Sequence, residues 1–298
     1  MKLQVSKRHT IHYELKGPPK GLPCVFVHGG PGAGFSSSDV ELFDLRRHRL
    51  LLYDQRGAGR SRPFACLQEN RPHHHVHDLK KLLDHLDMDK AILAGGSWGS
   101  LLSLLFAISY PERVHSLVLW GVFLGTKREC DYYIRGGARR HFPDLWARFV
   151  SPVPEEYRKD PVPFYFKKMT KGTPEEKEHF TYEWAYYETA ISRLKYSDRQ
   201  TKADLENFSY KSLAPLECYY NLHNFFLEPG YVLKKSARIA DIPSYLHQGR
   251  YDFVCPPEET YKLHNRLNRS HLLFSVAGHS HLDAQLQKEI VRTLKHVE

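Results

Sequence analysis

A serine stands at a sharp turn between a strand pattern and a helix pattern, and this turn constrains the fold more than any other feature. The apolar run 91–94 precedes Gly-Gly-Ser-Trp-Gly at 95–99, and the apolar run 101–106 follows it. Glycines on both sides of a serine allow a strained backbone and close packing of a helix against a strand. Taken alone, the pattern leaves two interpretations open: a nucleophilic serine, or a glycine-rich turn that binds phosphate through its N–H groups.

The length and composition indicate a folded α/β domain with room for an additional lobe. The chain has 298 residues, of which 41% are hydrophobic, and single α/β domains of about 200–250 residues are common. No apolar run approaches the roughly 20 residues that a membrane span needs. The first residues lack the apolar core of a signal peptide. We therefore expect a cytoplasmic protein with no membrane partner.

The cysteines and the excess of positive charge do not define a site by themselves. Five cysteines are scattered without a C-x-x-C motif, which is typical of reduced thiols. The net charge of +9 raises nucleic acid as a partner. However, the basic residues are dispersed in short groups and no recognition motif accompanies them. We therefore expect a solvated basic surface and no nucleic-acid partner.

A histidine-rich stretch at 73–77 suggests a metal site by its composition alone. It lacks a second ligand cluster nearby, and it runs into a helical pattern formed by Leu79, Leu82, Leu83 and Leu86. We interpret the stretch as the start of a helix and expect no metal, with metal binding as the alternative.

Strand and helix patterns alternate at both ends of the chain. The first series of segments covers 23–28, 49–54, 77–87, 91–94, 98–109 and 114–120. The second series has strands over 242–249 and 271–276 and helices over 256–267 and 282–296. Such alternation predicts a mostly parallel sheet with crossover helices.

The middle of the chain is different, because it is rich in aromatic and charged residues and has no buried-strand pattern. Segments 175–195 and 214–227 are typical of helices. We therefore predict an α/β fold whose core is split between 1–125 and 240–298, with an inserted helical cap domain at 126–239.

Polar residues that could activate Ser97 follow two later strands. Asp252 comes after the strand that ends at Gly249, and His279 comes after the last strand. The carboxyl ends of parallel strands meet at one edge of a sheet, so Ser97, Asp252 and His279 are expected to converge there. His279 would take the proton of the serine hydroxyl, and Asp252 would hold the imidazole in the required tautomer.

Four other residues stay open as alternatives. His281 and His247 compete for the role of the base, although His247 lies within a strand and His281 is predicted to start the final helix. Glu129 and Asp131 compete for the role of the acid, because they follow an earlier strand. Asp252 is preferred because it stands directly at a strand exit.

An oxyanion hole would need two backbone N–H groups near the serine. The residue after the nucleophile, Trp98, would provide one of them. The glycine-rich loop at 28–34 would provide the other from Gly30, because Pro31 has no N–H. This loop lacks the Lys-Ser/Thr ending of a phosphate-binding loop.

Three motifs stand at these positions: H-G-G-P-G at 28–32, D-Q-R-G-A-G-R-S at 54–61 and G-G-S-W-G-S at 95–100. Further matching pieces are Y-P-E-R-V at 110–114, F-P-D at 142–144, G-R-Y-D at 249–252 and G-H-S at 278–280. Together the motifs resemble the prolyl aminopeptidases, or proline iminopeptidases, over nearly the whole chain. The resemblance implies the α/β-hydrolase fold with a helical cap.

The resemblance also implies a serine exopeptidase that releases N-terminal proline from short peptides through an acyl-enzyme, with no metal or cofactor. In this family, acidic cap residues bind the free amino end of the substrate. W-A-Y-Y-E at 184–188 resembles the family's W-x-x-W-E and indicates Glu188. E-C-Y-Y-N at 217–221 matches the family's E-N-H-Y-F at Glu217 and Tyr220 only. The alternative is that these glutamates are surface residues of helices.

The proline ring would need an apolar slot, for which Phe123, at the family's R-G-x-F position, Tyr132 and Tyr133 are candidates. The alternative for these three residues is a place in the core of the cap.

Two departures from the family pattern concern specificity. Trp120 replaces an arginine, and Asn221 replaces the closing phenylalanine of E-N-H-Y-F. They make a broader aminopeptidase or an esterase on the same scaffold the alternative function. A third hypothesis is a non-catalytic binding protein on this scaffold. Cys255, three residues after Asp252, raises the question of a thiol near the site, and the sequence assigns no oligomeric state.

Overall fold

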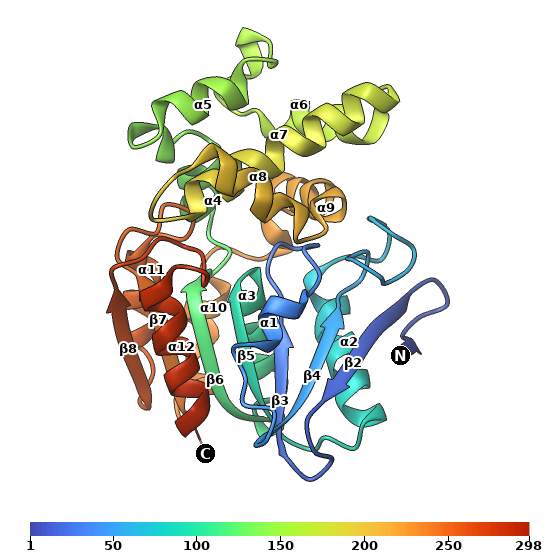
Figure 1. Ribbon diagram of the computed structural model, residues 1–298, viewed down its shortest axis with the longest axis vertical. Coiled ribbons are helices and arrows are strands. Elements are labelled where there is room, and N and C mark those ends of the chain that lie inside the picture. The colour runs from blue at the N-terminus through green and yellow to red at the C-terminus, as the bar shows by residue number, and fades with distance from the viewer. Residues whose placement is uncertain (298) are drawn as a thin grey trace.

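The computed structural model describes residues 1–297, which form a central eight-stranded sheet with helices around it (Figure 1). The strands are β1 Lys2–Gln4, β2 Thr10–Lys16, β3 Leu22–Val27, β4 His48–Asp54, β5 Ala91–Ser97, β6 Val114–Val122, β7 Ser244–Gly249 and β8 Ser270–Ser275. Their order in the sheet is β1-β2-β4-β3-β5-β6-β7-β8. Strands β3 to β8 pair in parallel, whereas β2 pairs antiparallel with β1 and β4. The predicted mostly parallel α/β sheet is confirmed.

The pleat of the central strands divides their apolar residues between two cores. In β3, Val25 and Val27 join the core on one face of the sheet, and Cys24 and Phe26 join the core on the other. The first face is covered by α2 Pro72–His85, α3 Trp98–Ser109 and α11 Pro257–His264. The second face is covered by α1 Ser37–Val40 and α12 Ala284–His296. Burial on both faces explains why these strands are continuous apolar runs.

Strands β1 and β2, near the N-terminus, are not among the elements predicted from the sequence. In β2, Ile11 and Tyr13 are buried while Thr10 and His12 are half-buried. This weak alternation is that of a strand with one face on the core. The pair extends the sheet beyond β4 and does not reach the site.

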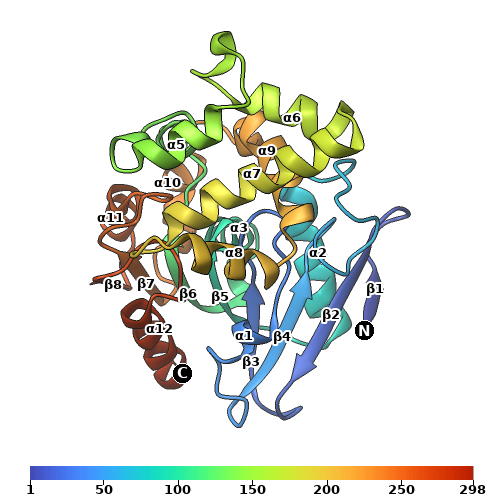
Figure 2. The same cartoon turned by 45° about the horizontal axis from the view of Figure 1, so that its top comes forward.

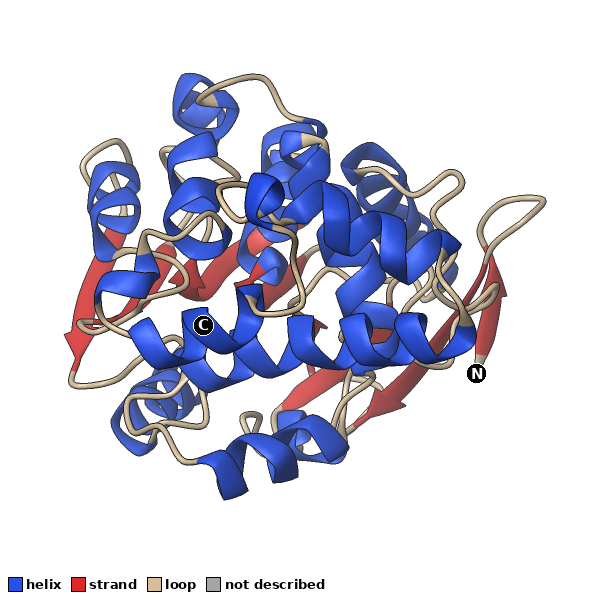
Figure 3. Cartoon of the chain, turned by 90° about the horizontal axis from the view of Figure 1, so that it is seen from above, coloured by secondary structure: helices blue, strands red, loops and turns tan. Residues whose placement is uncertain are grey.

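The chain between β6 and β7 is helical. Its helices are α4 Lys127–Ile134, α5 Pro143–Val150, α6 Val162–Lys171, α7 Pro174–Ser192, α8 Asp198–Glu206, α9 Tyr210–Leu222 and α10 Tyr231–Lys235. Helices α5 to α9 lie above the carboxyl ends of the strands (Figures 1 and 2) and cover much of the sheet when seen from above (Figure 3). Their contacts are largely aromatic: Phe149, for example, stacks on Tyr165 and Tyr187 with ring centroids 4.5 and 4.6 Å apart. The domain boundaries at 125 and 240 stay a prediction.

Some helices begin or end away from their predicted bounds. The final helix begins at Ala284, so His281 precedes it and does not start it, contrary to prediction. Helix α9 ends at Leu222 and not at 227, because residues 224–226 have φ of 47°, 54° and 55°, outside the right-handed helical region. The histidine-rich stretch lies in α2, which begins at Pro72, as expected of a helix start. In residues 1–297 no helix is long and apolar enough to cross a membrane.

We expect Gly99→Ala to destabilise the protein. A Cβ at Gly99 would lie 2.0 Å from the carbonyl oxygen of Val27, which belongs to the backbone of β3 and moves only with the sheet. Such overpacking costs about 1–3 kcal/mol or more, and each kcal/mol lowers Tm by about 2–4 °C in a protein of roughly this size. Thermal unfolding followed by circular dichroism measures the effect.

Gly29→Ala is the matched control, because a Cβ there would have its nearest neighbour at an ordinary 3.5 Å. Its Tm should stay close to that of the wild type. Equal losses of Tm in both variants would contradict the close contact between α3 and β3.

Candidate active site

Ser97 stands at the turn between β5 and α3 with φ 57° and ψ −128°. A residue other than glycine in this left-handed region indicates a strained backbone. The glycines before it are explained by contact: a Cβ at Gly95 would lie 2.6 Å from Val27 O, and a Cβ at Gly96 would lie 2.0 Å from Nε1 of Trp120. The turn is therefore built so that the half-buried serine faces open space at the carboxyl end of the sheet.

His279 and Asp252 follow neighbouring strands and are joined by a hydrogen bond. His279 Nδ1 lies 2.8 Å from Asp252 Oδ2. The same carboxylate accepts hydrogen bonds from Gln248 Nε2 at 2.9 Å and from the backbone N–H groups two and three residues after it, at 2.9 and 2.7 Å. Ser97 and His279 line one cavity. The structure therefore brings the three predicted side chains to one edge of the sheet.

The environment of His279 favours its charged form. Burial opposes the charge, but the adjacent Asp252 carboxylate outweighs it, and the pKa of His279 is raised from its usual value. The backbone leaves little space around this pair, since a Cβ at Gly121 would lie 2.8 Å from the His279 ring. Gly121 also has φ of 46°. The imidazole is thus held where it accepts a proton readily.

The two alternative acids have other partners. Glu129 caps α4 and accepts the backbone N–H of Leu124 at 3.0 Å and of Thr126 at 2.8 Å. Burial raises the pKa of Glu129 to about 7. Asp131 forms an ion pair with Lys127 on the same helix.

The two alternative histidines lie away from Ser97 or face another residue. His247 is buried within β7, and burial lowers its pKa to about 4. The Nε2 atom of His281 lies 3.4 Å from Asp39 Oδ1. Neither histidine is paired with Asp252.

The glycine-rich loop after β3 is tied to the elbow through Gln55. The backbone N–H of Gln55 donates to His28 Nε2 at 2.9 Å, and its side-chain amide donates to the His28 carbonyl at 2.8 Å. The side-chain oxygen of Gln55 accepts the indole N–H of Trp98 at 2.7 Å. Gly30 and Ser97 consequently line the same two cavities. Gln55 lies in a motif quoted above, but its bridging role follows only from the fold.

The two cavities that meet at Ser97 and Gly30 differ in size. The space open to the centre of a water-sized sphere is about 20 Å³ in the small cavity and about 500 Å³ in the large cavity. The small cavity is mainly apolar and is lined by Phe123, Cys130, Tyr133, Glu217, Asn221, Phe225, Val254 and Cys255, with Glu129 beside them. The large cavity passes His279 and extends between the sheet edge and helices α7 to α9.

Glu188 of α7 and Glu217 of α9 meet beside these cavities. Glu188 lines the large cavity, Glu217 lines the small one, and the two carboxyl groups are close enough to shift each other's pKa. Glu217 Oε2 accepts the indole N–H of Trp184 at 2.7 Å and the hydroxyl of Tyr133 at 3.4 Å. Burial raises the pKa of both carboxyls, and the charge of Glu188 raises that of Glu217 further. A cation placed between them would relieve this repulsion.

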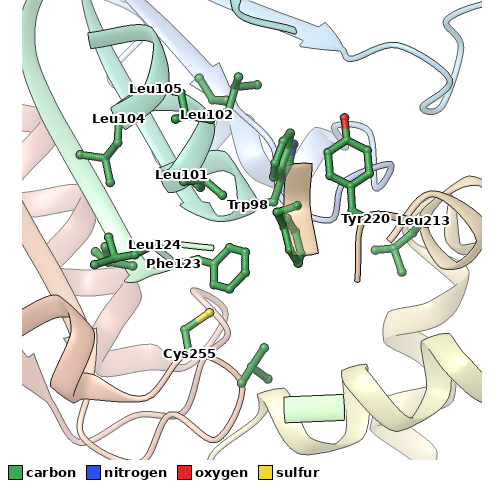
Figure 4. Close-up of a cluster of buried hydrophobic side chains, with 14 of the residues drawn as sticks. Trp98, Leu101, Leu102, Leu104, Leu105, Phe123, Leu124, Leu213, Tyr220 and Cys255 are labelled. Atoms are coloured by element: carbon green, nitrogen blue, oxygen red, sulfur yellow. The ribbon is translucent and has the colours of Figure 1, made fainter. Parts of the chain in front are cut away.

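The three predicted slot residues do not all reach the serine. Phe123 and Tyr133 line the small cavity, whereas Tyr132 lines a separate cavity behind Asp252. Phe225, which no sequence pattern singles out, packs edge-on against Phe123 with ring centroids 4.7 Å apart. Figure 4 shows Phe123 in a cluster of buried side chains with Trp98, Tyr220 and Cys255.

The two residues that depart from the family pattern lie on different sides of Ser97. Trp120 lines the large cavity, and Asn221 lines the small one. Cys255 also lines the small cavity, and burial raises the pKa of its thiol well above the usual value.

No group of three or more His, Cys, Asp or Glu side chains in residues 1–297 is placed to hold a metal ion. In the histidine-rich stretch, His75 is buried and hydrogen-bonds to Asn70 Oδ1 at 2.7 Å. That contact holds the His75 ring in the packing at the start of α2.

Comparison with known proteins first gives the class. Residues 23–283 match the family model of the α/β hydrolase fold. Among solved structures, an esterase from Exiguobacterium antarcticum has a TM-score of 0.67 and 18% sequence identity, covering 99% of this chain and 98% of that chain. The fold and the elbow define the protein as an α/β hydrolase.

Curated relatives then give the family. The chain is 38% identical to the Leptolyngbya boryana protein named "Probable proline iminopeptidase", over 97% of this chain and 91% of that protein. It is 36% identical to a proline iminopeptidase from Arabidopsis thaliana, over 97% of this chain and 77% of that protein. The chain belongs to the proline iminopeptidase family, whose members are aminopeptidases on the α/β-hydrolase fold, and the resemblance seen in its motifs is confirmed.

We expect Asp252→Asn to lower the pKa of His279. The uncharged amide does not offset the effect of burial, which lowers the pKa of His279. The imidazolium therefore loses its proton at a lower pH than in the wild type. A ¹⁵N NMR titration of the imidazole measures the change.

Asp39→Asn is the matched control, since Asp39 lines the same large cavity but is not bonded to His279. It should leave the pKa of His279 at its wild-type value. If Asp252→Asn also left this pKa unchanged, the Asp252–His279 bond would not control the charge on the ring.

Proposed function

We propose that the protein is a serine aminopeptidase that releases N-terminal proline from peptides. The observation that carries the proposal is the pair of carboxyl groups, Glu188 and Glu217, that meets next to Ser97. Membership in the proline iminopeptidase family supports it independently.

In this proposal the machinery for acyl transfer lies at the elbow. The Ser97 hydroxyl attacks the carbonyl carbon of the first residue while His279 takes its proton. The backbone N–H groups of Gly30 and Trp98 donate to the oxyanion. When the C–N bond breaks, His279 returns the proton to the departing amine, and water later hydrolyses the ester with the same base. Asp252 orients the ring and stabilises the imidazolium, as its 2.8 Å bond to Nδ1 supports.

The carboxyl pair suits the free end of a peptide. The N-terminal ammonium of a prolyl peptide has two N–H groups and one positive charge, and two carboxylates offer an acceptor for each N–H. Burial raises the pKa of both carboxyls, and the charge of Glu188 raises that of Glu217 further, so a bound cation gains more there than at an exposed site. An internal peptide nitrogen has no charge, which makes the site selective for chain ends.

The dimensions of the small cavity support a compact first residue. Phe123 and Phe225 form an apolar edge-to-face pair on it, and it is the smaller of the two cavities at Ser97. A proline ring is closed and short, so it requires less displacement of these side chains than leucine or phenylalanine would. Tyr133 closes the slot next to Glu217.

We expect a panel of aminoacyl 4-nitroanilides to show a preference for proline. The leaving group is constant, so only the first residue varies, and kcat/KM for proline should exceed that for alanine and leucine by about 10-fold or more. Ser97→Ala should lower kcat at least about 1,000-fold. A flat profile would replace the prolyl assignment with a broader aminopeptidase, and full activity of Ser97→Ala would remove the serine from the mechanism.

We expect Glu188→Gln and Glu217→Gln to weaken binding of prolyl amides but not of substrates without an amine. Loss of a charged hydrogen bond costs about 1.5–3 kcal/mol, so KM for the prolyl amide should rise about 10-fold or more. Hydrolysis of 4-nitrophenyl acetate, which has no amine, should change little.

Glu178→Gln is the matched control, because Glu178 lies on the same helix α7 with its side chain 56% exposed. It should leave both activities unchanged. Equal losses of amide and acetate hydrolysis in Glu188→Gln and Glu217→Gln would show that these residues support the fold of the site and do not bind the amine.

A further inference from the structure

The large cavity is far bigger than the first residue of a substrate requires. It begins at Ser97 and His279 and extends to Phe208 on the cap and Leu282 before α12. We propose that it binds the side chain of the second residue of the peptide, the one released with the leaving amine, and that it selects large apolar side chains there. This inference rests on the proposed aminopeptidase function.

The position of His279 assigns the large cavity to the leaving group. The histidine that protonates the departing amine must face the leaving side of the scissile bond. His279 lines the large cavity and is not among the residues of the small one, whereas Phe123 and Glu217 line the small cavity only. The acyl side and the leaving side of the substrate therefore fall into different cavities.

Apolar residues form part of the wall of the large cavity, alongside serine, threonine and asparagine residues. Trp120 pairs with Gly96 across the β5–β6 ladder, and its indole lies against the backbone just before Ser97. Phe26 stacks behind Trp120 with ring centroids 6.3 Å apart and an interplanar angle of 17°. Leu213 closes the cavity from α9. A fixed, supported indole is a suitable wall for an aromatic or branched side chain.

The outer part of the cavity adds two more apolar residues. Phe208 is half-buried, and Leu282 is 37% exposed. Both line the cavity from opposite sides, one from the cap and one from the segment before α12. A side chain inserted between them would cover apolar surface that is open to solvent without substrate.

The charged groups of the cavity favour neither acidic nor basic side chains. Asp39, Glu188 and Asp204 line it, and among the described residues no lysine or arginine does. Asp39 and Asp204 already face His281 at 3.4 Å and Arg193 at 3.5 Å, and Glu188 is engaged with Glu217. Because these acids already have partners and no lysine or arginine among the described residues lines the cavity, neither an acidic nor a cationic second residue finds a partner of opposite charge there. Uncharged side chains are therefore favoured, and the apolar wall residues Trp120, Phe208, Leu213 and Leu282 favour the apolar ones among them.

Release of free proline from Pro-Phe-NH₂, Pro-Gly-NH₂ and Pro-Asp-NH₂ by the wild-type enzyme tests the inference. We expect kcat/KM for Pro-Phe-NH₂ to exceed that for Pro-Gly-NH₂ by about 10-fold, a typical effect of one apolar group in a fitted pocket. Pro-Asp-NH₂ should be the poorest of the three.

Two variants test whether the large cavity produces the preference for phenylalanine over glycine. Trp120→Ala and Leu282→Ala should each reduce the Phe-to-Gly ratio of kcat/KM at least about threefold. Trp120 is buried and its truncation could impair folding, so the partly exposed Leu282 keeps the test valid. Leu273→Ala is the control, because Leu273 is 41% exposed on β8 and lines a different cavity; its ratio should equal that of the wild type.

The outcomes separate the two proposals. Equal rates for Pro-Phe-NH₂ and Pro-Gly-NH₂, or a ratio that survives both Trp120→Ala and Leu282→Ala, would overturn the subsite and leave the proline aminopeptidase intact. If no peptide released proline while Ser97 still hydrolysed other aminoacyl amides, the proposed function would be overturned, and the subsite for the second residue with it.

Discussion

The carbonyl oxygen of Val27 leaves no room for a side chain at Gly95 or Gly99, so the end of β3 is in direct contact with β5 and the start of α3. This contact determines where Ser97 stands. The chain reverses at one residue with φ 57°, which costs about 1–3 kcal/mol of backbone strain and is offset by the burial of α3. Because the loop that carries Gly30 begins right after Val27, the same contact also brings that loop to the serine.

The glycine-rich loop couples the sheet to the helices above it. Ser212 of α9 donates a hydrogen bond to the Gly32 carbonyl at 2.7 Å, and a Cβ at Gly32 would lie 2.7 Å from the Ser212 carbonyl. One turn further along α9 stands Glu217. The loop that would supply an oxyanion donor is therefore also in contact with the helix that carries one carboxyl of the proposed amine site. Changes in this loop are expected to affect both functions together.

The sequence was sufficient for those features that depend on strand order and local pattern. Ser97, Asp252 and His279 could be selected because each follows a recognisable strand, and parallel strands end at one edge. The antiparallel β1–β2 pair was missed because its alternation is weak. The sequence did not show which of Tyr132 and Tyr133 lines the small cavity. Neighbouring residues on a helix point in different directions, and only the packing of α4 decides which of the two faces that cavity. Phe225 depends on a left-handed backbone that no pattern predicts.

The pair of carboxyls stands where two cavities of unequal size meet at one serine. Glu217 faces the small cavity and Glu188 faces the large one, so an ammonium held by both would lie at the boundary between them. Under the proposed function, the first residue is then fixed at its amine, at its carbonyl and in the small cavity. The rest of the peptide leaves through the large cavity, past His279. Selectivity should accordingly be strict for the size of the first residue and graded, by apolar contact, for the second.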